Sequence, residues 1–188
     1  STEGNLRSRF AVHPEMAEST EYIRSELAAA LGDESVELHS FPIGSRRVVS
    51  YTSRRGVEAM APVDTMAHNV IGTLEGTDPE AGYYIICAHY DATGIRSSGG
   101  WDWMRDPAPG ADDNASGVAL VLESARLLAG QRFPWSIRFI AWSGEELGLL
   151  GSQEYANIAA ERDEKILGVF NFDMIGFNPF KQRLELVT

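Results

Sequence analysis

The chain has 188 residues, of which 44% are hydrophobic and 23% charged, so it can bury a substantial core and is neither disordered nor fibrous. Its net charge of -11, with Lys and Arg scattered along the sequence, argues against a nucleic-acid partner. No run reaches the roughly 20 apolar residues of a membrane span, and the first residues lack a signal-peptide pattern. The single cysteine, Cys87, lies in an apolar run and is interpreted as a small buried hydrophobic residue.

The N-terminal half predicts one helix followed by strands. Apolar residues recur at helical spacing over residues 14–31, and Gly32 follows the last turn. Strands are predicted at residues 36–41, 47–51 and 67–74, as the antiparallel side of a mixed sheet. His39 and His68 fall in these strands without a partner at ligand spacing, so we expect both to lie outside any functional site.

The C-terminal half alternates strands with helices. Apolar runs at residues 83–88, 136–142 and 166–172 are typical of buried parallel strands, and helices are predicted at residues 116–129 and 148–160. This order predicts an α/β fold with a mixed, mostly parallel central sheet and helices on both faces.

Two further stretches carry expectations. The loop at residues 90–111 is unusually long, and its Trp101 and Trp103 either line a substrate or partner surface or pack the loop onto its own domain. Residues 183–188 alternate like a strand and then stop without a cap or turn. We therefore expect residues 1–188 to form a single domain that is truncated at its C-terminal end.

Four polar clusters follow the predicted strands or tight loops. They are AHYD at residues 88–91, GADDNASG at 110–117, SGEE at 143–146 and NFD at 171–173. Open α/β sheets bind ligands at the carboxyl ends of their strands, so these side chains should converge. Converging carboxylates repel one another unless a positive charge lies among them. One imidazole with several carboxylates suits zinc, and two ions can share a carboxylate, so the sequence predicts a two-metal hydrolase.

Each cluster also has a purely structural interpretation. Asp113 could cap the following helix, and Glu145 could be an acidic residue in the first turn of the next one. His89 could be a core histidine and Asp173 a cap at a strand end. Four such coincidences in order are less plausible than one shared site.

The four motifs, in this order over residues 69–176, resemble those of the co-catalytic zinc aminopeptidases of peptidase family M28. That family includes bacterial leucine aminopeptidases, glutamate carboxypeptidase II and the transferrin receptors. The resemblance implies a zinc exopeptidase-like fold, two Zn²⁺ ions, a peptide substrate and removal of N-terminal residues. A secreted or periplasmic location is implied by this family habit alone.

The resemblance also implies a set of metal ligands. His89 and Asp173 would hold one ion, Glu146 and a later histidine would hold the other, and Asp113 would bridge both. This sequence has no histidine after His89, which departs from the family pattern. Truncation would explain the missing ligand; a chain that ended here would hold one metal or none and could be inactive.

The remaining roles concern the residues beside the ligands. Glu145 would be the general base, and Asp91 would orient His89 through its other ring nitrogen; two residues apart on an extended strand, these side chains point the same way. Asp112 would support the bridging residue through hydrogen bonds, although the sequence alone leaves open the reverse assignment, with Asp112 as the bridge. The resemblance further implies a cis peptide bond between Asp113 and Asn114.

Three alternatives keep the fold and change the function. A carboxypeptidase would need a basic pocket, and none is evident in the sequence. A glutaminyl cyclase-like enzyme would use one zinc, whereas the Glu145–Glu146 pair and the bridging motif favour two. A non-catalytic receptor-like domain would be expected to lose ligands, and only the missing histidine favours it.

Overall fold

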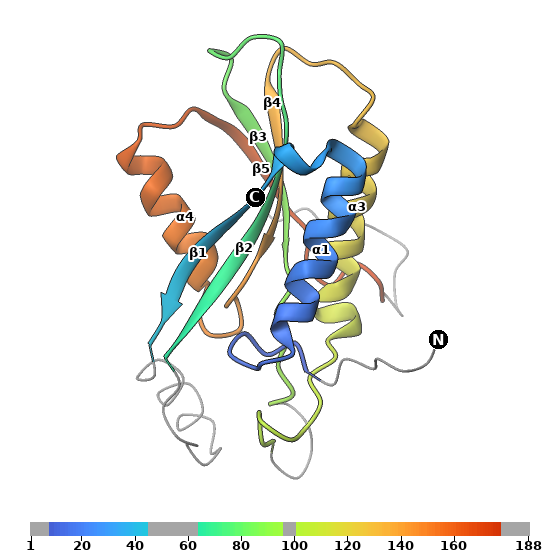
Figure 1. Cartoon of the computed structure of the whole chain (residues 1–188), viewed down its shortest axis with the longest axis vertical. Coiled ribbons are helices and arrows are strands. Elements are labelled where there is room, and N and C mark those ends of the chain that lie inside the picture. Colours follow the sequence, from blue (N-terminus) through green and yellow to red (C-terminus); the bar gives the residue numbers. More distant parts are fainter. Residues whose placement is uncertain (1–7, 45–63, 96–100, 178–188) are drawn as a thin grey trace.

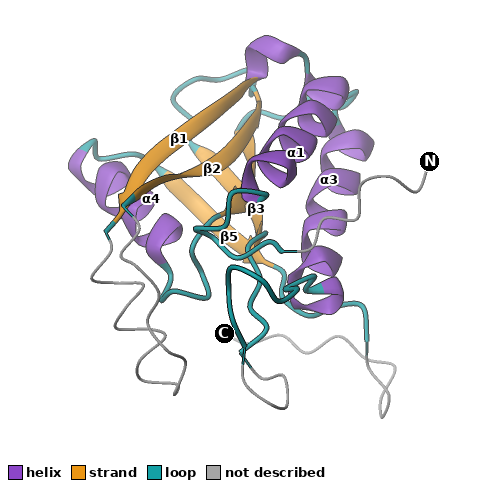
Figure 2. Ribbon diagram, turned by 60° about the horizontal axis from the view of Figure 1, so that its bottom comes forward, coloured by secondary structure: helices purple, strands orange, loops and turns teal. Residues whose placement is uncertain are grey.

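The computed structural model describes residues 8–44, 64–95 and 101–177, which form a sheet between helices on both faces (Figure 1; Figure 2). Within these residues the sheet has five strands in the order β1-β2-β4-β3-β5. The elements are α1 (Met16–Leu31), β1 (Val36–Ile43), β2 (Thr65–Leu74), β3 (Tyr83–His89), α3 (Gly117–Leu128), β4 (Ser136–Trp142), α4 (Leu150–Glu161) and β5 (Ile166–Asn171).

The strand directions confirm the predicted mixed, mostly parallel sheet. β2 pairs antiparallel with both β1 and β4, whereas β3 pairs parallel with both β4 and β5. β1, β3, β4 and β5 therefore run in one direction, and β2 alone runs in the other. The predicted strand at residues 47–51 and the strand-like residues 183–188 lie outside the described residues.

Helices cover the two faces unequally, as Figure 1 shows. α1 and α3 lie together on one face, where Leu27 and Val121 are buried against sheet residues such as Phe139. α4 covers the other face through Tyr155 and Ala159. α1 ends at Leu31 and is capped by Gly32, whose φ of +97° favours glycine and whose N–H donates to the carbonyl oxygen of Ala28. None of the described helices is both long and apolar enough to span a bilayer.

The aromatic residues of the long loop belong to the core. Trp101 and Trp103 are only 4% and 2% exposed. The ring centroid of Phe10 lies 5.0 Å from that of Trp101 and 5.8 Å from that of Trp103. The packing alternative is therefore correct, since these indoles fix the loop to the N-terminal segment and leave little surface for a substrate.

Truncating Leu27 tests the packing of α1. Leu27→Ala should lower the free energy of unfolding by about 2–5 kcal/mol, because a side chain that is 0% exposed leaves a cavity. The matched control Leu127→Ala, at a position 60% exposed on α3, should change it by less than about 0.5 kcal/mol. Urea unfolding of both variants provides the comparison, and equal losses would contradict this packing.

Candidate metal centre

The sheet topology brings the four predicted clusters to one edge. His89 is the last residue of β3, Glu145 follows β4 by three residues, and Asp173 follows β5 by two. Because β3, β4 and β5 are parallel neighbours, their carboxyl ends meet at this edge. Asp113 lies in the turn at residues 110–116, which directly precedes α3.

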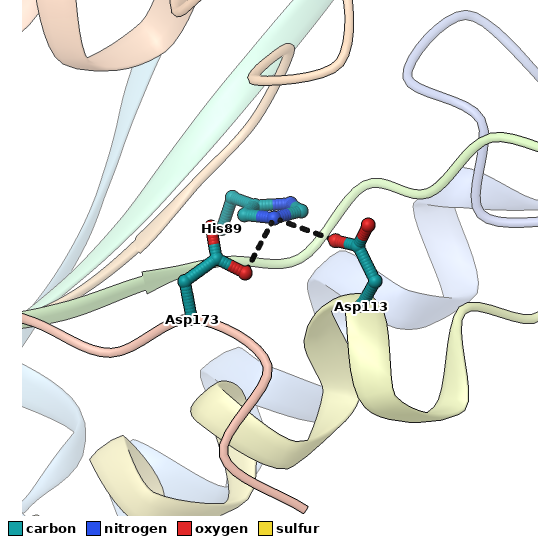
Figure 3. Close-up of side chains that lie close together, drawn as sticks. All are labelled: His89, Asp113 and Asp173. Carbon is teal, nitrogen blue, oxygen red and sulfur yellow. Dashed lines mark ion pairs between the residues drawn. The ribbon is translucent and has the colours of Figure 1, made fainter. Parts of the chain in front are cut away.

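Three side chains point at one another at this edge (Figure 3). His89 Nε2 lies 3.1 Å from Asp113 Oδ1 and 3.7 Å from Asp173 Oδ1. One ligand atom from each of these residues lies within 4.8 Å of the other two. The histidine is buried, whereas the Asp113 and Asp173 side chains are 36% and 44% exposed, so the group opens to solvent on its carboxylate side.

The other ring nitrogen of His89 fixes its orientation. Nδ1 lies 3.0 Å from the main-chain oxygen of Asp91, which can only accept a hydrogen bond. Nδ1 therefore carries a proton, and Nε2 faces the carboxylates. A histidine anchored in this way, beside two carboxylates with an open side, provides a donor set that suits a zinc ion.

The carboxylate of Asp91 makes hydrogen bonds that could not be predicted from the sequence. It lies 3.7 Å from His89 Nδ1, while its two oxygens accept hydrogen bonds from the main-chain N–H groups of Glu145 at 3.0 Å and Glu146 at 3.1 Å. Asp91 is 0% exposed, so these bonds are shielded from water. Asp91 thus contacts His89 mainly through its carbonyl and holds the glutamate pair with its side chain.

Asn69 binds the main chain at both ends of the loop that carries Glu145 and Glu146. Its Oδ1 accepts from the N–H of Ser143, and its Nδ2 donates to the carbonyl oxygen of Gly151. Nδ2 also lies 3.0 Å from Nδ1 of His39. His39 therefore contacts a residue that holds this loop, and His68 contacts Ser40. Among the described residues, neither histidine is part of the ligand group.

A second pair of polar residues joins Asp113 to Asp173. Asn114 donates through Nδ2 to the carbonyl oxygen of Phe172, and its Oδ1 accepts from the N–H of Gly117, the first residue of α3. Asp112 Oδ1 accepts from the N–H of Gly176. Asn114, and not Asp113, therefore accepts the hydrogen bond from the first N–H of α3. The peptide bond between Asp113 and Asn114 is cis, as the resemblance implies.

The electrostatics show how crowded this edge is. Burial and neighbouring carboxylates raise the pKa of Glu145 and of Asp173, and His89 partly offsets this. Burial, followed by the charge of Asp113, raises the pKa of Glu146 to about 7. Burial lowers the pKa of His89, but the nearby carboxylates outweigh it and raise the value to about 9. The centre therefore attracts positive charge strongly.

Glu145 and Glu146 do not join the three-residue ligand group. Glu145 Oε2 lies 4.0 Å from His89 Nε2. Glu146 is placed so that Asp113 exerts the largest charge effect on its pKa. The structure thus brings His89, Asp113 and Asp173 into ligand range of one another and leaves the two glutamates beside them.

A cavity of about 320 Å³ opens beside the centre. His89, Glu145 and Asp173 contribute to its lining, and most of the other lining side chains are apolar. No lysine or arginine is among its described lining residues. Cys87 also lines it, is 1% exposed, and has its pKa raised by burial to about 11, which fits a small buried hydrophobic residue.

A protein family and several curated proteins are similar to this chain in sequence. The profile described as peptidase family M28 matches residues 69–184. A probable zinc metalloprotease of Pyrenophora teres is 41% identical over 107 residues, which are 57% of this chain and 22% of that protein. Aminopeptidase YwaD of Bacillus subtilis is 38% identical over 114 residues, covering 58% of this chain and 22% of that protein. The chain therefore spans only a small part of these relatives.

Solved structures share the fold at lower identity. An aminopeptidase from Aneurinibacillus sp. strain AM-1 has a TM-score of 0.68 and 18% identity, covering 91% of this chain and 68% of that chain. A glutaminyl cyclase from an Acidobacteriales bacterium has a TM-score of 0.69 and 19% identity, covering 90% of this chain and 54% of that chain. These likenesses concern the fold, which is that of zinc exopeptidases as predicted.

Gly151 offers a test of how Asn69 holds the glutamate loop. A Cβ at position 151 would overlap Oδ1 of Asn69 and the carbonyl oxygen of Ser143. Gly151→Ala should therefore lower the free energy of unfolding by about 1–3 kcal/mol, although alanine is the better helix former. Gly130→Ala, where no atom lies within 4 Å of the added Cβ, is the control and should be nearly neutral. Equal unfolding curves for the two variants would contradict the close approach.

Proposed function

Because the chain belongs to peptidase family M28, we propose that it carries the metal centre of a zinc-dependent aminopeptidase, which removes N-terminal residues from peptides. The family is one of peptidases, and the curated relatives named above are a probable zinc metalloprotease and an aminopeptidase. The observation that carries the proposal for this chain is the convergence of His89, Asp113 and Asp173 within 4.8 Å.

We propose that the centre holds two zinc ions that share Asp113. His89 and Asp173 would hold the first ion, and Glu146 would hold the second on the other side of Asp113. Two observations support this division: Glu146 lies outside the three-residue group, and Asp113 is the neighbouring charge that most affects it. With fewer protein ligands from this sequence, the second ion should bind more weakly than the first.

Glu145 is the residue proposed as the general base. When bound, zinc would polarise the scissile carbonyl and make a water molecule more acidic. Glu145 lines the cavity, its Oε2 lies 4.0 Å from His89 Nε2, and its main-chain N–H donates to Asp91. Its carboxylate would take the proton of the attacking water and deliver it to the leaving amine as the peptide C–N bond breaks.

The carboxylates also favour an N-terminal substrate. A free α-ammonium group would be attracted to an edge that carries several acidic side chains. A carboxypeptidase would need a cation for the terminal carboxylate, and the described lining of the cavity contains no lysine or arginine. The likeness to a glutaminyl cyclase concerns the fold alone, and a receptor-like domain would not need the convergent ligand group.

Replacing the proposed base should separate catalysis from metal binding. Glu145→Gln should lower kcat for an aminoacyl-nitroanilide by about 10²–10⁴, because an amide cannot accept the proton, while zinc content stays unchanged. Glu154→Gln makes the same substitution at an exposed position on α4 and should retain full activity. Activity is measured on the zinc-loaded protein together with its metal content.

The products that the protein forms from a short peptide distinguish the aminopeptidase from the alternative enzymes. Release of the N-terminal residue supports the aminopeptidase, and release of the C-terminal residue would instead indicate a carboxypeptidase. Cyclisation of an N-terminal glutamine without hydrolysis would indicate a cyclase. Full activity in Glu145→Gln would remove this residue from its proposed role.

A further inference from the structure

The N-terminal segment at residues 8–12 joins the two ends of the long loop between β3 and α3, beside the metal centre. The N–H of Arg9 donates to the carbonyl oxygen of Ala108 at 3.0 Å, and the carbonyl oxygen of Arg9 accepts from the N–H of Ala92 at 2.9 Å. Ala92 directly follows Asp91, and Ala108 precedes the turn that contains Asp113. The main chain of Arg9 therefore connects the two ends of the long loop between β3 and α3.

The Arg9 side chain continues this connection toward Asp113. Its Nε donates to the carbonyl oxygen of Pro109 at 3.0 Å, and its Nη2 donates to that of Gly110 at 2.5 Å. The same Gly110 oxygen accepts from the N–H of Ala115 at 3.0 Å. The guanidinium thus holds two consecutive carbonyls at the start of the turn that presents the Asp113 carboxylate.

Little room remains for another arrangement of this turn. Gly110 has a φ of +51°, and a Cβ there would overlap the main-chain oxygen of Asp113 and lie 2.8 Å from Nη2 of Arg9. Next to Arg9, Phe10 is 0% exposed and packs against Trp101 and Trp103, which fixes the main chain from which the guanidinium extends. A rigid fork of N–H groups can serve both carbonyls at once, whereas an ammonium group has no such fixed geometry.

The positive charge of Arg9 and its hydrogen bonds to the turn should have opposite effects on zinc binding. Burial lowers the pKa of Arg9, and the charges of Asp91 and Asp113 oppose that effect; a guanidinium in a protein stays charged. A permanent positive charge near a cation site would, by itself, repel zinc. If the hydrogen bonds to the turn matter more, removing Arg9 should weaken zinc binding; if the charge matters more, removal should strengthen it.

We infer that Arg9 is a positioning residue of the metal centre, which holds the Pro109 and Gly110 carbonyls so that Asp113 faces His89 and zinc binds more tightly. The inference rests on the proposed function only in that zinc is taken to bind at this centre. It assigns to the N-terminal segment a part in metal affinity that none of the ligand motifs indicates.

Zinc titration by calorimetry on the metal-free protein tests this inference. Arg9→Met, which keeps an unbranched apolar side chain, should weaken zinc binding about 10- to 100-fold, the usual effect of losing a residue that orients a ligand. Arg9→Lys keeps the charge without the fork and should fall between Arg9→Met and wild type. Arg105 lies in the long loop that Arg9 contacts, but its side chain is 79% exposed. Arg105→Met removes the same charge and should bind zinc like wild type.

Unfolding of each variant in the presence of a chelator separates affinity from stability. An arginine with a merely structural role would lower the stability of the metal-free protein and leave the zinc affinity of the folded fraction unchanged. Should Arg9→Met fail to fold, the affinity of Arg9→Lys decides. Zinc binding as tight as wild type in the folded Arg9 variants, or tighter, would overturn the inference. Absence of zinc binding in the wild type would overturn the proposed metal centre and this inference with it.

Discussion

Mutual repulsion among carboxylates at one edge of the sheet is the constraint that the rest of the structure serves. Asp113, Glu145, Glu146 and Asp173 surround His89, and burial with neighbouring charge raises the pKa of both glutamates and of Asp173. Two carboxylates about 4 Å apart repel by roughly 4 kcal/mol at the effective dielectric typical near a protein surface. A fold that gathers such groups needs both a positive charge among them and a frame that keeps them there.

The frame is built from polar side chains that bind main-chain groups. Asp91 and Asn69 hold the loop of the glutamate pair from its two sides. Asn114 joins the turn of Asp113 to the exit of β5, and Arg9 holds the start of that turn. A single hydrogen bond contributes about 1 kcal/mol, and one to a charged group about 1.5–3 kcal/mol, so only several acting together match the repulsion. This explains why nearly every loop at this edge is tied to another.

Much of this arrangement could be predicted from the sequence, because its signals are local. Apolar runs marked β3, β4 and β5, and the polar residue after each run marked the edge of the sheet. The family resemblance drawn from these motifs is confirmed by the match to residues 69–184. The sequence allows Asp113 to be a helix cap, but in the structure the first N–H of α3 donates to Asn114 Oδ1 instead.

The supporting contacts could not be predicted, because they join residues far apart in the sequence. Arg9 and Gly110 are 101 positions apart, and Asn69 and Ser143 are 74 apart. Arg9 and Asn69 each look like an ordinary polar residue in their own segments. The sequence predicts that Asp91 orients His89, but its use of both oxygens on Glu145 and Glu146 depends on how the loop after β4 meets the residues that follow β3. Local patterns carry no information about such pairings.

The proposed function depends most on a cation being held among these carboxylates. The most direct measurement is diffraction at the zinc absorption edge from crystals of the protein grown with zinc. An anomalous peak is expected among His89 Nε2, Asp113 and Asp173, with a second, weaker peak between Asp113 and Glu146. Zinc bound elsewhere, with no peak in contact with His89, would contradict it.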